Sequence, residues 1–129
     1  MAEDLARVDS PVTDRDLAGH RAQLVDPLTL RHAAGSVHNM TPPTQGVISL
    51  LIVGILDVLD IGAVPQGSAD YVHLCVEATK QAFRVRDRYV TDPRYMKVTA
   101  QDLLKAEHVR ELAQRIDRRR AEPWGGKTQ

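Results

Sequence analysis

The sequence has very little cysteine, since Cys75 is the only one in 129 residues, and this excludes a disulfide within the chain. Its five histidines include no pair at the i, i+4 spacing of a helical zinc site, and Cys75 has no cysteine partner. We therefore predict neither a metal site nor a cofactor. Cys75 falls on an apolar helical stripe, which favours a small core residue over a nucleophile.

An excess of charge of either sign is also missing, because 17 basic residues balance 17 acidic ones. Proteins that bind nucleic acid typically carry clustered Lys and Arg in excess. The one basic run, Arg118 to Arg120, is flanked by Asp117 and Glu122. We predict no nucleic-acid partner.

Long hydrophobic runs are absent as well. The apolar stretch 47–56 has about ten residues, half of what a bilayer crossing requires, so we predict no membrane partner. No charged-then-apolar leader follows Met1. Together with the single cysteine, this favours a cytoplasmic protein. The 43% hydrophobic content suits one modest globular domain, which we place over residues 1–129 because no linker divides them.

What the sequence does contain is a series of helix start signals, so the predicted fold is mainly α. A short helix is expected in residues 2–8, and Thr13 with Asp16 forms a capping-box pattern that predicts a second one. Residues 27–39 alternate apolar and polar side chains and turn near Gly35. They predict at most a short β-hairpin.

The segment "MTPPTQGVISLLIVGIL" joins a turn to an apolar run. Pro42 and Pro43 fix the backbone and stop the preceding element. Thr44 can then cap a helix that begins at Gln45 or Gly46. We predict a structural rather than a substrate-binding role for Thr44 and Gln45.

Residues 47–61 are apolar on every face until Asp57 and Asp60, the pattern of a helix surrounded by protein. Gly54 would let another backbone approach closely. The neighbouring elements can cover about two sides of such a helix, and a broad exposed apolar surface promotes association. We therefore predict a homo-oligomer that forms through this helix or through the next one.

Ser68 is placed to cap a helix over residues 69–90. Its apolar stripe comprises Tyr71, Leu74, Cys75, Ala78, Ala82, Val85 and Tyr89. The charged residues lie largely off that stripe, and we expect Glu77 and Arg88 to form surface ion pairs or caps. An Asp92-Pro93 turn ends the helix. Thr99, with Asp102 at the capping-box distance, then predicts one further helix with a buried face formed by Leu103, Leu104, Val109, Leu112, Ala113 and Ile116.

Taken in order, these segments resemble the C-terminal part of the large subunit of γ-glutamyltransferases. That family shows a Pro-Pro-Ser-Ser-Gly-Gly turn before an apolar helix, an "HxxxEAxKxAFxxR" helix, an Asp-Pro turn and a Leu-Leu helix. The positions that carry the resemblance include Pro42, Pro43, Thr44, Gln45, Gly46, His73, Glu77, Asp87, Arg88, Asp92 and Pro93. Thr-Gln-Gly-Val in place of Ser-Ser-Gly-Gly suggests a divergent or acylase-like branch.

The resemblance implies a fragment of an N-terminal-nucleophile hydrolase with an αββα parent fold. In that family a precursor cuts itself before a threonine, which then attacks a γ-glutamyl amide. The threonine heads a small subunit that follows this segment, so the resemblance implies no catalytic or substrate-binding residue here. Thr128 is an unsuitable nucleophile because only Gln129 follows it.

Two functions are compatible with the sequence. The first is a fragment or subunit of an enzyme that hydrolyses or transfers γ-glutamyl amides of the glutathione type. It would be inactive alone, and its partners would be the missing segments or the small subunit. The second is a stand-alone helical interaction module that uses an apolar face to bind a partner or itself.

Overall fold

The computed structural model describes residues 2–123, so Thr128 lies outside the described residues. Its helices are α1 (Ala2–Ala6), α2 (Asp14–Gly19), α3 (Gly46–Val58), α4 (Ala69–Tyr89) and α5 (Ala106–Gln114). Short 3-10 turns are η1 (Ile61–Ala63), η2 (Pro93–Tyr95) and η3 (Asp102–Leu104). Strands β1 (Leu28–His32) and β2 (Gly35–Asn39) form one antiparallel hairpin. The prediction of a mainly α fold with a hairpin near residues 27–39 is confirmed.

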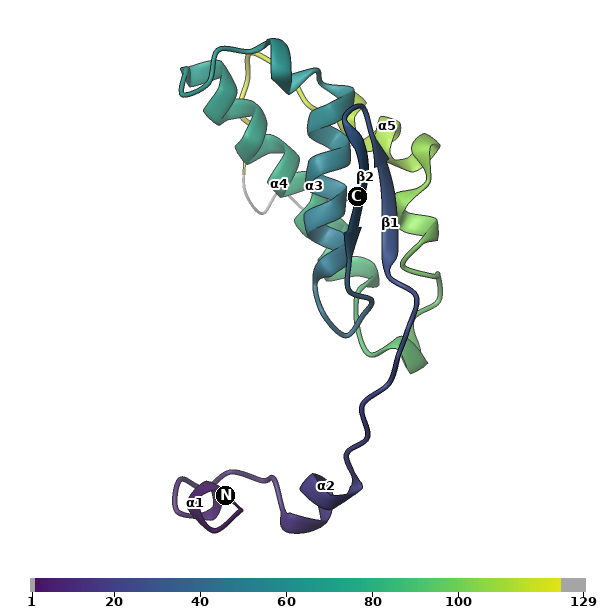
Figure 1. The fold of residues 1–129 in the computed structure, drawn as a ribbon. Helices are drawn as coiled ribbons and strands as arrows, with labels where there is room; N and C mark the ends of the chain where they lie inside the picture. Colours follow the sequence, from purple (N-terminus) through teal and green to yellow (C-terminus); the bar gives the residue numbers. More distant parts are fainter. Residues whose placement is uncertain (1, 124–129) are drawn as a thin grey trace.

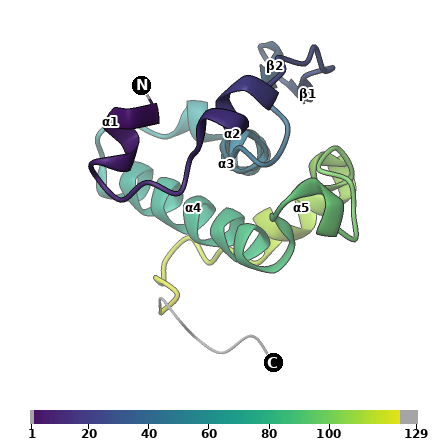
Figure 2. The same cartoon turned by 90° about the horizontal axis from the view of Figure 1, so that it is seen from below.

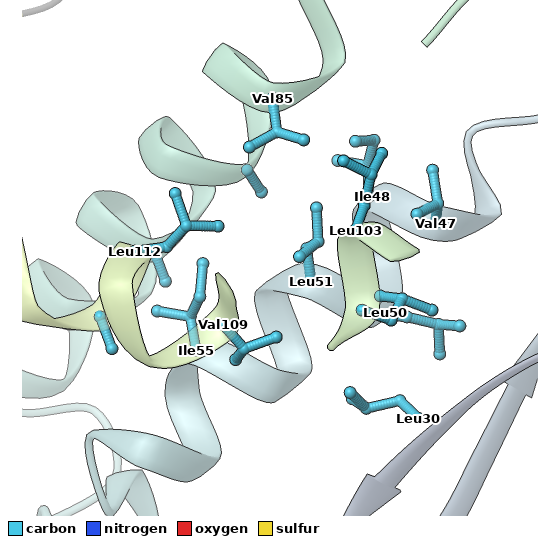
Figure 3. Close-up of a cluster of buried hydrophobic side chains, with 14 of the residues drawn as sticks. Leu30, Val47, Ile48, Leu50, Leu51, Ile55, Val85, Leu103, Val109 and Leu112 are labelled. Carbon is cyan, nitrogen blue, oxygen red and sulfur yellow. The ribbon is translucent and has the colours of Figure 1, made fainter. Parts of the chain in front are cut away.

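Helix α3 lies at the centre of the body (Figure 1), where it contacts the hairpin, α4, α5 and η3. Figure 2 shows the hairpin on one side of α3, with α4 and α5 on the other. The chain itself buries the inner residues of α3, all at most 3% exposed (Figure 3): Val47, Ile48, Leu50, Leu51 and Ile55. Ile52, Val53 and Leu56 are only partly buried, and Val58 is exposed, so the chain covers the inner sides of α3 and leaves its outer side partly open, as the sequence predicts.

The hairpin and α5 meet α3 at Gly54. A Cβ at Gly54 would lie 3.1 Å from a methyl carbon of Val109 and 3.2 Å from one of Leu30. The absence of a side chain therefore admits side chains of two neighbours, rather than another backbone. On the outer edge of β1, the Gln101 amide donates to the Thr29 carbonyl at 2.8 Å and accepts from its N–H at 3.1 Å.

The two ends of α3 differ from the prediction in detail. The cap position is Gln45, without a side-chain hydrogen bond, while the Thr44 hydroxyl accepts from the Gly46 N–H at 3.2 Å. The helix ends at Val58 rather than at residue 61. Asp60 adopts φ 53° and ψ 51°, a left-handed conformation that a right-handed helix cannot continue.

The last predicted helix is interrupted. Thr99 does accept from the Asp102 N–H at 3.1 Å, but the turn that it caps is only η3. Lys105 is extended, with φ −60° and ψ 139°, and α5 starts after it. All six predicted core residues of this region are nevertheless buried.

The break at Lys105 has a geometric reason. Successive residues of a helix point about 100° apart. In one continuous helix, Leu103 and Leu104 would therefore face away from Val109 and Leu112. The extended Lys105 lets both pairs face α3, so burial of the leucines outweighs helix continuity.

The N-terminal elements lie apart from the body (Figure 1). Thr13 and Asp16 form the predicted capping box at the start of α2. Neither α1 nor α2 has a buried residue, and Leu24 and Val25 in the following segment are exposed. These elements are held by local hydrogen bonds and not by the core.

Cys75 is not the core residue that the sequence predicts. It is half-buried, whereas Leu74 and Ala78 occupy core positions. It lines a hollow of about 320 Å³ on the outer side of α4, together with Tyr71, Val72, Val76, Thr79 and Lys80. The buried stripe of α4 is thus rotated relative to the predicted one and includes Glu77 and Gln81.

We expect the Gly46→Ala substitution to destabilise the chain by about 1–3 kcal/mol, the usual cost of overpacking. An added Cβ would collide with the Met40 carbonyl oxygen and lie 2.9 Å from Cγ of Asn39. Urea unfolding measures the change. Gly62→Ala is the matched control, because no atom lies within 4 Å of its added Cβ, and a similar loss in both variants would contradict the explanation.

We also expect Cys75 to react with a thiol reagent in the native state faster than a core thiol does, because its side chain is only half-buried. The reference is the double variant Cys75→Ser/Ala78→Cys, which moves the thiol to a position with 0% exposure on the same helix. Labelling is followed by mass spectrometry with and without denaturant. Equal native rates in the two proteins would contradict the prediction.

Candidate functional site

The turn before α3 is closed by its own hydrogen bonds. The Thr44 hydroxyl lies 3.0 Å from the Thr41 carbonyl oxygen, and the peptide bond between Pro42 and Pro43 is cis. Gly46 is buried against Met40 and Asn39, whereas Thr44 and Gln45 are exposed. These contacts support the structural role predicted for the turn.

Glu77, predicted to be a surface residue, is buried. Only 2% of it is exposed, and its Oε1 accepts from Lys80 Nζ at 2.6 Å. The Lys80 side chain is itself only 12% exposed. Buried charges of this kind are costly unless they are paired and hydrogen-bonded. The Glu77–Lys80 pair therefore requires further hydrogen bonds from the segment that covers it.

The cover is a segment distant in sequence, at Glu122. Its carboxylate accepts from Arg84 at 2.7 Å and from the Gln81 amide at 3.1 Å. Its backbone carbonyl accepts from Lys80 at 2.6 Å, and its N–H lies 3.4 Å from Glu77 Oε2. The hydrogen bond from Arg84 holds the pKa of the Glu122 carboxyl below its ordinary value. One residue thus bonds to four side chains of α4.

The same segment is attached at its beginning. The His73 ring nitrogen Nε2 lies 2.8 Å from the Asp117 carbonyl oxygen. The Arg118 guanidinium donates to the Leu59 carbonyl at the end of α3. His73, Glu77 and Lys80 of the family motif therefore meet on one polar face of α4, where they hold the chain that follows α5.

Sequence reasoning missed two members of this face, Gln81 and Arg84. Gln81 is 0% exposed and lies three residues after Ala78 and four before Val85, so helical spacing alone could have identified its burial. Its Oε1 has no hydrogen-bond partner among the described residues. The contact between Arg84 and Glu122 has no signal in the sequence.

Other motif residues lie elsewhere. Asp87 is exposed and accepts from Arg86 Nε at 2.8 Å, and the Arg88 guanidinium lies 5.2 Å from the Tyr89 ring centre. Counting along the motif from His73 reaches Arg86, so the assignment to Arg88 is wrong. Arg86 lies 4.0 Å from the Phe83 ring centre.

Helix α4 ends at Tyr89, with Val90 as its C-cap, and the predicted Asp92-Pro93 turn follows as the start of η2. An Asp92 side-chain oxygen accepts from the Arg94 N–H at 2.9 Å, and the Arg94 side chain holds the pKa of the Asp92 carboxyl below its ordinary value. Both side chains are at least partly exposed. The turn is therefore a local structural element.

The described residues offer no evident catalytic arrangement. Thr29 Oγ1 lies 3.0 Å from His38 Nδ1, but the two residues are direct neighbours across the hairpin, and no described carboxylate bonds to the other ring nitrogen. Within residues 2–123, no three His, Cys, Asp or Glu side chains gather as a metal site would require. No helix in this range has the length and apolarity to span a bilayer.

A family model and individual relatives both match almost the whole chain. The family model described as Gamma-glutamyltranspeptidase matches residues 1–129. The chain is 46% identical over 126 residues to the oxamate amidohydrolase proenzyme of Klebsiella pneumoniae subsp. pneumoniae, covering 98% of this chain and 24% of that protein. It is 31% identical over 124 residues to the glutathione hydrolase proenzyme of Escherichia coli, covering 95% and 21% respectively.

Solved structures share the fold. The γ-glutamyltranspeptidase of Pseudomonas nitroreducens matches 95% of this chain and 37% of its own, with a TM-score of 0.80 and 22% identity. A cephalosporin acylase from Bacillus halodurans matches 90% of this chain and 21% of its own, with a TM-score of 0.74 and 28% identity. The chain spans about a quarter or less of the curated relatives named above. It belongs to the γ-glutamyltranspeptidase family.

Proposed function

We propose that this chain forms the helical scaffold of a larger amide-hydrolysing enzyme and does not catalyse by itself. The observation that carries the proposal is the 46% identity, over 98% of this chain, to a proenzyme named as an amidohydrolase. The lack of an evident catalytic arrangement in residues 2–123 agrees with a nucleophile supplied by another part of the parent. The partners would be those remaining segments or the small subunit.

The proposed chemistry is attack of a threonine hydroxyl on an amide carbonyl. The carbon–nitrogen bond breaks, the amine leaves with a proton, and the acyl group stays on the threonine oxygen. Water then releases the acid, or an acceptor amine takes the acyl group. The free α-amine of the threonine acts as the base in both steps.

The substrate we favour is an amide of a small carboxylic acid. Identity is 46% with the oxamate amidohydrolase and 31% with the E. coli glutathione hydrolase. The Thr-Gln-Gly-Val sequence after Pro43 also departs from the Ser-Ser-Gly-Gly of typical γ-glutamyltransferases. A γ-glutamyl amide of the glutathione type is the alternative substrate, and both belong in the same assay.

We expect the purified chain to release no product from oxamate or from a γ-glutamyl anilide above the buffer background, because its described residues lack a catalytic arrangement. Product is measured as ammonia or as free aniline. Thr128→Ala is the control, because it tests whether Thr128 acts as a nucleophile. Turnover by the wild-type chain that is lost in this variant would overturn the proposal.

A chimera tests the scaffold role directly. In the chimera, this chain replaces the corresponding segment of the Klebsiella oxamate amidohydrolase proenzyme. We expect the chimeric protein to mature and to hydrolyse oxamate. The control chimera carries Leu51→Asp, which places a charge at a core position with 0% exposure. If the unmodified chimera folds but neither matures nor hydrolyses oxamate, the proposed function is wrong.

A stand-alone interaction module is the second candidate. The observation in its favour is the apolar outer face of α4, where Val72 is 54% exposed and Val76 is 47% exposed beside Cys75. Light scattering over a dilution series measures self-association. If the chain is such a module, we expect it to form a dimer that Val76→Asp dissociates. A well-folded monomer at high micromolar concentration would exclude self-association through this face.

A further inference from the structure

Residues 117–122, which we call the strap, run along one face of α4. The strap contacts α4 through two residues: Asp117 lies against His73, and Glu122 lies against Glu77, Lys80, Gln81 and Arg84. Residues 118–120 bend between them, and the Arg119 N–H donates to the Asp117 carboxylate at 2.8 Å. The strap is therefore attached to α4 at both of its ends.

The contacts divide by type. His73, Glu77 and Lys80 reach only backbone atoms of the strap, namely the Asp117 carbonyl and the Glu122 N–H and carbonyl. Gln81 and Arg84 instead bind the Glu122 side chain. Backbone groups are present whatever the strap sequence is. The three motif residues can therefore hold a strap of almost any sequence, while Gln81 and Arg84 add a preference for an acid at position 122.

The α4 side chains that bind the strap are largely buried. Glu77 is 2% exposed, Gln81 is 0% exposed and the Lys80 side chain is 12% exposed. If the strap left, Lys80 and the Gln81 amide would each lose an acceptor, and Glu77 would lose the Glu122 N–H that faces it. Hydrogen bonds to charged groups contribute more to stability than neutral ones, so their loss disfavours the open strap.

We propose that His73, Glu77 and Lys80 are positioning residues that bind the strap backbone and so fix the path of the chain beyond α5. This rests on the proposed function in one respect. If the parent matures by cleavage before a threonine that follows this segment, the strap sets the approach to that junction. Loosening the strap then slows maturation and leaves the mature enzyme's chemistry unchanged.

Trypsin cleavage of the 129-residue chain tests the strap itself, because Arg118, Arg119 and Arg120 lie within it. These arginines are exposed, and the rate of cleavage reports how often the strap leaves α4 to adopt the conformation that a protease cuts. We expect Lys80→Met to raise the cleavage rate at these arginines about fivefold or more, the scale of one lost charge-assisted hydrogen bond. Mass spectrometry quantifies the strap fragments, and Lys80→Arg should restore the slow rate.

The matched control is Lys105→Met. Lys105 also pairs with an acid three residues before it, Asp102, at 2.7 Å, but its side chain is 64% exposed and does not contact the strap. We expect it to leave strap cleavage within twofold of wild type. If Lys80→Met does not fold, His73→Phe takes its place, because the His73 side chain is only partly buried and its ring nitrogen lies 2.8 Å from the Asp117 carbonyl oxygen. Unchanged strap cleavage in the folded variants would overturn the proposal.

The oxamate amidohydrolase chimera tests the functional consequence. Lys80→Met and His73→Phe should slow self-cleavage about fivefold or more, while kcat/KM per matured molecule stays unchanged. Variants that mature at the wild-type rate despite a loosened strap would overturn the role in maturation. A wild-type chimera that fails to mature counts against the proposed function alone, since trypsin measures the strap in the chain itself.

Discussion

Burial of α3 is the constraint on which the other elements depend. An apolar helix without charge on its inner faces must be covered on each of them, and the hairpin, α4, α5 and η3 together provide that cover. Two glycines make the packing possible, Gly46 where the preceding turn folds back and Gly54 where β1 and α5 converge. The need to keep Leu103 and Leu104 on α3 also explains why the last helical region breaks at Lys105.

The second constraint is electrostatic and follows from the first. Packing α4 against α3 turns Glu77 and Gln81 away from solvent, on a helix that otherwise presents charged residues. A buried carboxylate and ammonium need hydrogen bonds beyond their own pair. The backbone N–H and carbonyl of Glu122 supply them, so the packing of one side of α4 against α3 creates a face on α4 that binds the strap.

The relatives of this chain carry the names of different enzymes. Proenzymes named oxamate amidohydrolase, glutathione hydrolase and acylase are 46%, 31% and 32% identical to this chain. The segment that they share with this chain is therefore not restricted to one enzyme name. The turn before α3 and the polar face of α4 serve structural roles in the contacts observed here, which agrees with that breadth.

Local chemistry in the sequence determined much of the fold. Ser68 and the Thr13–Asp16 pair cap the helices where the pattern predicts, and apolar alternation places the hairpin. These signals act between residues a few positions apart, so a single segment contains them. Only the tertiary structure decided the burial of Glu77, the half-exposure of Cys75, the break at Lys105 and the cover over α3. Each depends on contacts between residues far apart in the chain, such as Glu122 with Arg84, and helical periodicity carries no information about which face such a distant partner will occupy.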